Sequence, residues 1–174
     1  MKMMTCIEGK NVLLRDVVED DAEFVLNLRL DQNKNKYINK TNADLQEQIK
    51  YIKNSHNKNG EYYFIIEDKT SGRLGTVRIY DIIEDDFSWG SWIIINDAPY
   101  YAGVESALLI YETAFYSLGF KKSHFEVRKE NLKVVDFHKR MGAIIKSEDD
   151  LNYYFSYSIE SYESVKYKYK KFLK

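Results

Sequence analysis

The segment WIIINDAPYYAGVESALLIYETAF, residues 92–115, passes from an apolar run through small residues into a helix-like pattern. Small residues stand where the expected strand gives way to the expected helix: Ala98, Ala102, Gly103 and Ser106. Small side chains let a ligand approach the main chain, and a helix N-terminus offers unpaired N–H groups to an anion. The sequence contains neither G-x-G-x-x-G nor Gly-Lys-Ser/Thr, which argues against the common dinucleotide and triphosphate loops. The segment therefore predicts another kind of anion site.

No further group of residues predicts covalent or metal chemistry. The three histidines and one cysteine have no metal-ligand spacing, and no Ser-His-Asp order or activated cysteine is apparent. His56 falls in an expected loop and His124 in an expected strand, so both are weak candidates for catalysis. The sequence predicts that any reaction here runs without a metal and without a covalent enzyme intermediate.

Hydrophobic periodicity predicts the elements that position this segment. Apolar residues at helical spacing over 104–118 end at Gly119, which suits a helix C-terminus. The tail after residue 160 fits either alternation or a helix, and we favour a helix. The expected strands are 11–17, 62–68, 72–82, 87–95, 123–129, 143–148 and 152–159, and the other expected helices are 22–29, 45–52 and 131–142. The order β-α-α-β-β-β-α-β-α-β-β predicts one α/β domain over 1–174 with a mixed sheet.

Three local signals refine this order. Thr41 and Asp44 match a capping box before the second helix, and residues 69–72 predict a hairpin turn. Gly90, inside an apolar strand pattern, is typical of a bulge or of a close approach between backbones.

The composition is that of a single globular domain. The 174 residues suffice for one ordinary core, and 26 Lys and Arg against 27 Asp and Glu give a formal charge of −1. This balance argues against general nucleic-acid binding. No apolar run approaches the ~18 residues of a membrane span, and the N-terminus lacks the apolar core of a signal peptide. With Cys6 as the one cysteine, we expect a cytoplasmic protein without disulfides and without a membrane partner.

The element order, and a helix that begins after a bulged strand, resemble the GNAT superfamily of acetyl-CoA-dependent N-acetyltransferases over nearly the whole chain. In that family the loop before the central helix holds the coenzyme pyrophosphate through main-chain N–H groups, usually within Gln/Arg-x-x-Gly-x-Gly/Ala. The matching residues here are Ala98-Pro99-Tyr100-Tyr101-Ala102-Gly103. Gly103 keeps the last small position, whereas Tyr101 and Ala98 replace the first Gly and the Gln/Arg. The resemblance implies a mixed, mostly antiparallel central sheet with helices on both faces.

The resemblance also implies where acetyl-CoA binds. Pantetheine would add along the strand as an extra strand does, and a bulge at Gly90 would aim a main-chain N–H at the thioester oxygen. The residues implied for these contacts are Ile93, Ile94 and Ile95. Those implied around the pyrophosphate are Tyr101, Ala102, Gly103, Val104, Glu105 and Ser106.

A second stretch, ENLKVVDFHKRMGA, resembles the family segment Asn-x-x-Ala/Ser…Tyr-x-x-x-Gly-Phe. Asn131 takes the place of the Asn that contacts pantetheine, and Gly142 that of the Gly. His138 stands in the place of the tyrosine that acts as general acid, and an imidazolium could protonate a departing thiolate. The alternative is a half-buried helical histidine with no catalytic role.

The general base is the least determined part of the implied site. Some members use a Glu on the strand before the central helix, where this chain has only serines among aromatics. Glu126, on the following strand, is the candidate that could deprotonate the amine. The alternative is a solvated carboxylate paired with Arg128 or a lysine, and Asp81 is a weaker candidate.

The acceptor is usually held by the first two helices and their connection. The stretches LRLD…NKYINKT and DFHKRMGA resemble the branch that acetylates nucleotide-linked amino sugars for surface polysaccharides. In that reading, Arg29, Lys36 and Lys40 would neutralise a diphosphate and Tyr37 would stack on a base or sugar. The alternatives are a solvated basic face, an acetyltransferase for protein N-termini or ribosomal proteins, and a non-catalytic CoA-binding module. A homodimer is compatible with every reading.

Overall fold

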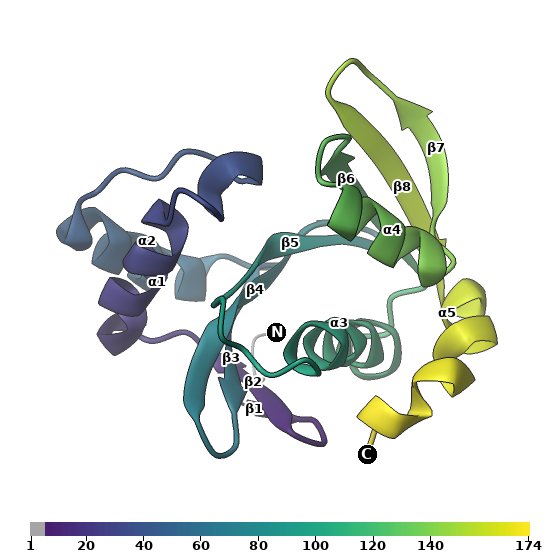
Figure 1. The fold of residues 1–174 in the computed structure, drawn as a ribbon, viewed down its shortest axis with the longest axis horizontal. Helices are drawn as coiled ribbons and strands as arrows, with labels where there is room; N and C mark the ends of the chain where they lie inside the picture. The colour runs from purple at the N-terminus through teal and green to yellow at the C-terminus, as the bar shows by residue number, and fades with distance from the viewer. Residues whose placement is uncertain (1–5) are drawn as a thin grey trace.

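The protein, described here over residues 6–174 of a computed structural model, is built on an eight-stranded sheet (Figure 1). The strands follow the order β1-β2-β3-β4-β5-β6-β8-β7, and all neighbours are antiparallel except β5 and β6. Their bounds are β1 Cys6–Glu8, β2 Val12–Asp16, β3 Tyr62–Asp68, β4 Gly72–Ile83, β5 Asp86–Ile94, β6 Lys122–Arg128, β7 Ile144–Glu148 and β8 Asn152–Ser158. The predicted mixed, mostly antiparallel sheet is confirmed.

Helices cover both faces of the sheet, as predicted (Figure 1). The α-helices are α1 Ala22–Leu30, α2 Leu45–Asn57, α3 Ala102–Glu112, α4 Leu132–Arg140 and α5 Ile159–Lys166. Shorter turns are η1 Glu19–Asp21, η2 Asn35–Tyr37, the π-helical turn η3 Thr113–Ser117 and η4 Tyr167–Phe172. We call the two sides of the sheet the α1 face and the α3 face.

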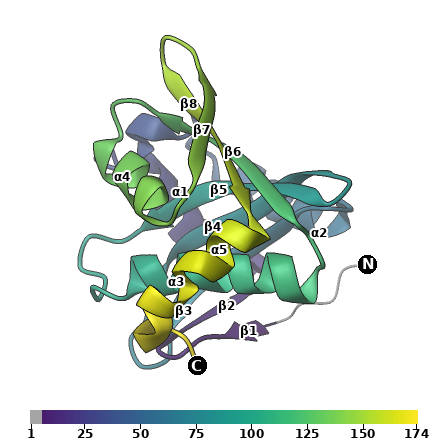
Figure 2. The same ribbon diagram turned by 90° about the vertical axis from the view of Figure 1, so that its right-hand side faces the viewer.

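Two hydrophobic clusters hold these layers together. The larger cluster lies on the α3 face. There α3 runs beneath the curved sheet, and α5 lies beside α3 (Figure 2). The smaller cluster joins α1 and α2 to β3 through residues such as Val25, Ile52 and Ile65. Alternation along β3 explains this division, because Phe64 and Ile66 belong to the larger cluster while Tyr63 and Ile65 belong to the smaller.

The structure corrects the sequence-based elements in few places. Strand β1 was not predicted, and α3 continues into η3 rather than staying regular to residue 118. The predicted capping box at Thr41 is wrong, because Asp44 itself is the N-cap and accepts hydrogen bonds from the N–H groups of Gln46 and Glu47. The helical tail is confirmed as α5 and η4. In residues 6–174 we find no helix long and apolar enough to cross a membrane.

Candidate active site

Strands β5 and β6 are the parallel pair of the sheet, and they pair only at one end. Asp86 lies opposite Lys122 and Phe87 opposite Ser123, after which no further pairs form. The strands therefore diverge, and the opening between them is called the splay. The sheet offers unpaired main-chain groups in its middle at this point rather than at an edge, which favours ligand binding there.

A β-bulge in β5 lies beside the splay. Gly90 pairs with Arg78 and Ile93 with Thr76, so that two residues of β5 stand opposite one of β4. The two residues of the bulge are Ser91 and Trp92, which stand opposite Val77, and Ser91 has a positive φ of 48°. The predicted bulge is thus confirmed, but it begins one residue after Gly90.

The bulge decides which main-chain groups face the splay. Ile95 N–H donates to Leu74 O, and the Ile93 carbonyl lies so close to Gly75 that a Cβ there would overlap it. Both residues therefore direct their main-chain groups toward β4. Ile94 faces the other way, and its carbonyl accepts a hydrogen bond from Lys34 Nζ. Because strand polar groups alternate in direction, only Ile94 of the predicted trio Ile93–Ile95 presents its main chain to the splay.

Two contiguous cavities follow this opening. The splay cavity, of about 370 Å³, contains Gly90, Ile94, Glu126, Asn131 and His138 among its lining residues. The outer cavity, of about 470 Å³, continues from it to the start of α3. The two share Lys34, Trp92, Ile94, Lys133 and Val134.

The start of α3 lines the outer cavity with three of the predicted residues, Ala102, Gly103 and Val104. A Cβ built on Gly103 would lie 3.7 Å from Trp92 Cζ2, which is ordinary contact, so a larger side chain would extend into this space. The first N–H groups of a helix have no acceptor within it, and they favour an anion. Three cationic side chains lie around the cavity: Lys34, Lys133 and Arg140.

The other three residues predicted at this loop have structural partners instead. Tyr101 donates its hydroxyl hydrogen bond to Asp68 Oδ2 at 2.7 Å. The buried carboxylate of Glu105 accepts hydrogen bonds from Asn11 and from Val12 N–H, which fixes the start of β2. Ser106 is fully buried and donates to Gly103 O at 3.0 Å. The side chains of Tyr101, Glu105 and Ser106 are thus engaged within the protein, and Glu105 N–H donates to Tyr101 O at 2.8 Å. A main-chain role for this loop in holding the pyrophosphate stays a prediction.

His138 lines the splay cavity but is almost completely buried, with 4% exposure. Its ring lies 4.2 Å from that of Phe125 and 5.5 Å from that of Trp89, and Nδ1 has no hydrogen-bond partner. Burial lowers the pKa of His138 to about 3. The predicted imidazolium acid needs correction, because this histidine is neutral near pH 7.

The side chain of Glu126 lines two cavities that meet at the splay. It lines the splay cavity, and it lines a second space of about 340 Å³ that we call the far-face cavity. The remaining residues of the far-face cavity are Tyr80, Asp81, Ser88, His124, Phe125, Tyr154 and Phe155. Glu126 is exposed, which agrees with the alternative of a solvated carboxylate, but within residues 6–174 it forms no ion pair with Arg128 or a lysine.

His124 has a more defined setting than its sequence suggested. Its Nδ1 lies 2.8 Å from Asp86 Oδ1 and its Nε2 lies 3.1 Å from Asp81 Oδ2. Burial alone would lower the pKa of His124, but hydrogen bonds and charge from the two carboxylates raise it. The pair of carboxylates was not visible in the sequence, since Asp81 is 43 residues away. They tie the β4–β5 hairpin to β6.

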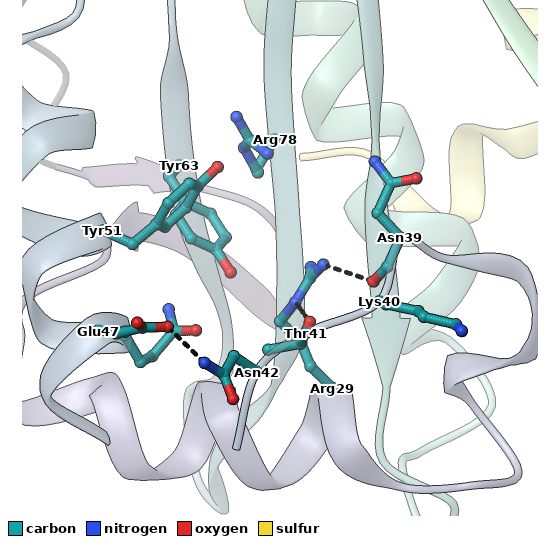
Figure 3. Close-up of a pocket in the computed structure, with 10 residues that line it drawn as sticks. Arg29, Asn39, Lys40, Thr41, Asn42, Glu47, Tyr51, Tyr63 and Arg78 are labelled. Atoms are coloured by element: carbon teal, nitrogen blue, oxygen red, sulfur yellow. Dashed lines mark hydrogen bonds between the residues drawn. The ribbon is translucent and has the colours of Figure 1, made fainter. Parts of the chain in front are cut away.

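The arginine cavity, of about 310 Å³, lies between α1, α2 and the sheet (Figure 3). Its lining is Arg29, Asn39, Lys40, Thr41, Asn42, Glu47, Gln48, Tyr51, Tyr63 and Arg78, with three cations against one carboxylate. Arg29 is held by Thr41 Oγ1 at 2.7 Å and by the Asn39 carbonyl at 3.3 Å. Figure 3 shows the two tyrosine rings across the cavity from this segment.

Two buried donors in this cavity lack partners, Gln48 Nε2 and Arg78 Nε. Buried polar groups are nearly always hydrogen-bonded, so such donors point to a ligand. The structure therefore brings the predicted Arg29 and Lys40 together. It does not place Lys36 or Tyr37 with them. Lys36 forms an ion pair with Glu130 at 3.6 Å, and Tyr37 lines the splay cavity and donates its hydroxyl hydrogen bond to Glu130 O at 3.3 Å.

A family model described as the acetyltransferase (GNAT) domain matches residues 11–144. The chain belongs to the GNAT family. GNAT domains use acetyl-CoA as the acetyl donor, and this GNAT protein is an acetyltransferase. No curated protein sequence matches it.

Solved structures agree with this assignment. The GNAT chain is similar to apo FdhC, described as a nucleotide-linked sugar GNAT, with a TM-score of 0.88 and 44% identity over 99% of this chain and 100% of that one. A GCN5-related N-acetyltransferase from Brucella melitensis gives a TM-score of 0.82 at 16% identity, covering 98% and 86% of the two chains. The spermidine/spermine N-acetyltransferase SpeG from Vibrio cholerae gives 0.74 at 17%, covering 90% and 98%. The last two show the fold alone.

The GNAT cavities fit the coenzyme. The outer cavity combines a helix N-terminus, a glycine without a blocking side chain and three cations, which suits a diphosphate. The splay offers the unpaired strand edge that an extended pantetheine arm would use. In residues 6–174, we find no group of His, Cys, Asp and Glu arranged to hold a metal ion.

Proposed function

We propose that this enzyme transfers the acetyl group of acetyl-CoA to the amino group of a nucleotide-linked sugar. The observation that carries the proposal is the position of the arginine cavity beside the splay. Tyr63, Arg78 and Gly90 lie opposite one another on β3, β4 and β5, and strands are spaced by about 4.8 Å. The cavity and the splay are thus about 10 Å apart on the α1 face, a span that one extended nucleotide sugar can bridge. The similarity to FdhC, a nucleotide-linked sugar GNAT, supports this acceptor class.

In this proposal, Arg29, Lys40 and Arg78 bind the diphosphate, and the exposed ring of Tyr51 offers a stacking surface to the base. Tyr37 lies at the splay cavity, so it would contact the sugar or the donor rather than the base. Arg78 is ion-paired with Glu61 at 2.8 Å, so the excess positive charge of the lining comes from Arg29 and Lys40 against Glu47, in a chain whose formal charge is −1.

The coenzyme would occupy the outer cavity and the splay. The N-terminal turn of α3 would hold its pyrophosphate at Gly103 and Val104, since Ala102 N–H already donates to Pro99 O at 2.9 Å. The exposed Lys133 and Arg140 would bind its outer phosphates. Ile94 and Asn131 would bind the arm that enters the splay.

Bound acetyl-CoA supplies the thioester whose acetyl group is transferred. Glu126, which faces both cavities, accepts the proton that the amine loses as it attacks. No residue that the structure describes is arranged as a covalent nucleophile, so transfer is direct. His138 contributes packing to the wall of the splay cavity rather than a proton.

The test is the rate of thiol release from acetyl-CoA with three kinds of acceptor. These are nucleotide-linked amino sugars, the same amino sugars without the nucleotide, and peptides with free N-termini. We expect kcat/KM for the nucleotide-linked sugars to exceed that for the free sugars by at least 100-fold, because a diphosphate pocket contributes several charge-assisted hydrogen bonds worth about 1.5–3 kcal/mol each. Faster turnover of peptides would overturn the proposed acceptor.

A further inference from the structure

Tyr80 extends from β4 over the neighbouring strand to the edge of the splay. A Cβ built on Gly90 would lie 2.8 Å from the Tyr80 hydroxyl oxygen, but 3.5 and 3.6 Å from the ring atoms Cε1 and Cζ. The hydroxyl therefore occupies the space that any side chain at position 90 would need. Gly90 lines the splay cavity and Tyr80 lines the far-face cavity, so the hydroxyl lies where these two cavities meet.

The ring of Tyr80 is held in place by its neighbours. The Arg78 guanidinium lies 5.3 Å from its centroid, and Arg78 itself donates a 2.8 Å hydrogen bond to Glu61. In the register of the sheet, Tyr80 stands opposite Ser88, another residue of the far-face cavity. The hydroxyl has no hydrogen-bond partner in the part of the chain described, 6–174, although the rest of the side chain is fixed. Because Tyr80 is half-buried and lines the far-face cavity, its hydroxyl is available to a ligand there.

We propose that the Tyr80 hydroxyl binds the acceptor amine and orients it for attack. Its oxygen accepts a hydrogen bond from one N–H of the neutral amine, and the nitrogen lone pair then points into the splay toward the thioester carbon. The C–N bond forms as the C–S bond breaks, and the electron pair of that bond leaves with sulfur as the thiolate. The second amine proton passes to the Glu126 carboxylate across the opening. Tyr80 keeps its own proton throughout.

This inference rests on the proposed function, because it names a further residue that contacts the same acceptor. It also explains why a glycine stands at position 90. Gly90 has an ordinary negative φ, so backbone conformation does not require a glycine there. With any other residue at position 90, the Tyr80 hydroxyl would have to move from its present place.

The first experiment compares Tyr80→Phe with wild type in steady-state kinetics and in acetyl-CoA binding by calorimetry. We expect kcat/KM for the acceptor to fall about 10-fold, the value of one hydrogen bond, with an unchanged dissociation constant for acetyl-CoA. The matched control is Tyr153→Phe, because Tyr153 lies on β8, the strand beyond β6, and packs against Phe155 on the α3 face. Wild-type acceptor kinetics in Tyr80→Phe would overturn the inference.

The second experiment is a double-mutant cycle with Gly90→Ala. In the wild-type background the new methyl must displace the hydroxyl, so Gly90→Ala should reproduce the loss seen in Tyr80→Phe. In the Tyr80→Phe background the methyl meets only ring carbons at ordinary distance, and we expect no further loss of kcat/KM. A large additional loss there would mean that Gly90 makes room for substrate rather than for the hydroxyl, and would contradict the inference.

The two proposals fail in different ways. If wild-type protein releases no thiol with any amine of the panel, the proposed function fails. If wild type acetylates the nucleotide-linked sugar and Tyr80→Phe does so equally well, the function stands and only the role of Tyr80 is lost. Thermal melts of wild type, Tyr80→Phe, Tyr153→Phe, Gly90→Ala and the double variant confirm that each is folded before rates are compared.

Discussion

Replacing His138 by phenylalanine tests how the splay cavity is built. The folded protein holds His138 neutral, with a pKa of about 3 against an ordinary value of 6.5. An unfolded chain takes up a proton on this residue below pH 6.5, but the folded chain does not until about pH 3. By linkage, the free energy of unfolding therefore falls as pH decreases through this window. At about pH 5 the gap is about 1.5 pH units, which corresponds to about 2 kcal/mol.

Phenylalanine removes this acid sensitivity and also removes the unpartnered Nδ1, whose burial costs about 1 kcal/mol at any pH. We expect His138→Phe to match or exceed wild-type stability at about pH 7.5 and to exceed it by about 2 kcal/mol more at about pH 5. For a chain of 174 residues this is a difference of roughly 4–8 °C in melting temperature.

The assay is urea unfolding of both proteins at the two pH values, followed by tryptophan fluorescence. If the free energy of unfolding of the two proteins changed with pH in the same way, the neutral, buried state of His138 would be refuted. The same variant tests the chemistry: kcat should stay within a few-fold of wild type, and a 100-fold loss would restore His138 as a proton donor.

Three further predictions concern other parts of the site. The pKa of His124 is raised, so its contribution to the free energy of unfolding is complete below its ordinary pKa of 6.5 and is lost as pH rises through the pKa of the folded protein. His124→Asn should therefore be most destabilising in acid. A difference in urea unfolding that does not depend on pH would contradict this. Gly103→Val should raise the dissociation constant for acetyl-CoA about 10-fold by calorimetry, whereas Gly103→Ala should not, because its Cβ meets Trp92 at 3.7 Å. Glu126→Gln should lower kcat by about 100-fold without changing acetyl-CoA binding, and an unchanged kcat would remove Glu126 as the base.

The sequence predicted the fold well because periodicity and turn residues carry that information locally. Apolar residues at helical spacing after Gly103 specified α3, and the turn at 69–72 specified the β3–β4 hairpin. The short strand β1 was missed because only three residues pair with β2. A strand this short forms because it pairs with its neighbour, and its own sequence is too short to show an alternating hydrophobic pattern.

The site was harder to predict because it depends on register. A bulge one residue after Gly90 decides that Ile94, and not Ile93 or Ile95, faces the splay, and no pattern in an apolar run records that choice. The state of His138 depends on rings from β5, β6 and β8, which are distant in sequence. The carboxylate of Glu105, beside the loop, binds the start of β2, a partner 93 residues away that no local pattern indicates.

The central claim is direct acetyl transfer between two ligands that meet at the splay. The most direct measurement is mass spectrometry of a quenched reaction containing the enzyme, acetyl-CoA and a nucleotide-linked amino sugar. We predict a nucleotide sugar heavier by one acetyl group and an enzyme of unchanged mass at every time point. An acetylated enzyme that accumulates and then decays, or a nucleotide sugar left unmodified while a peptide amine is acetylated, would contradict the account.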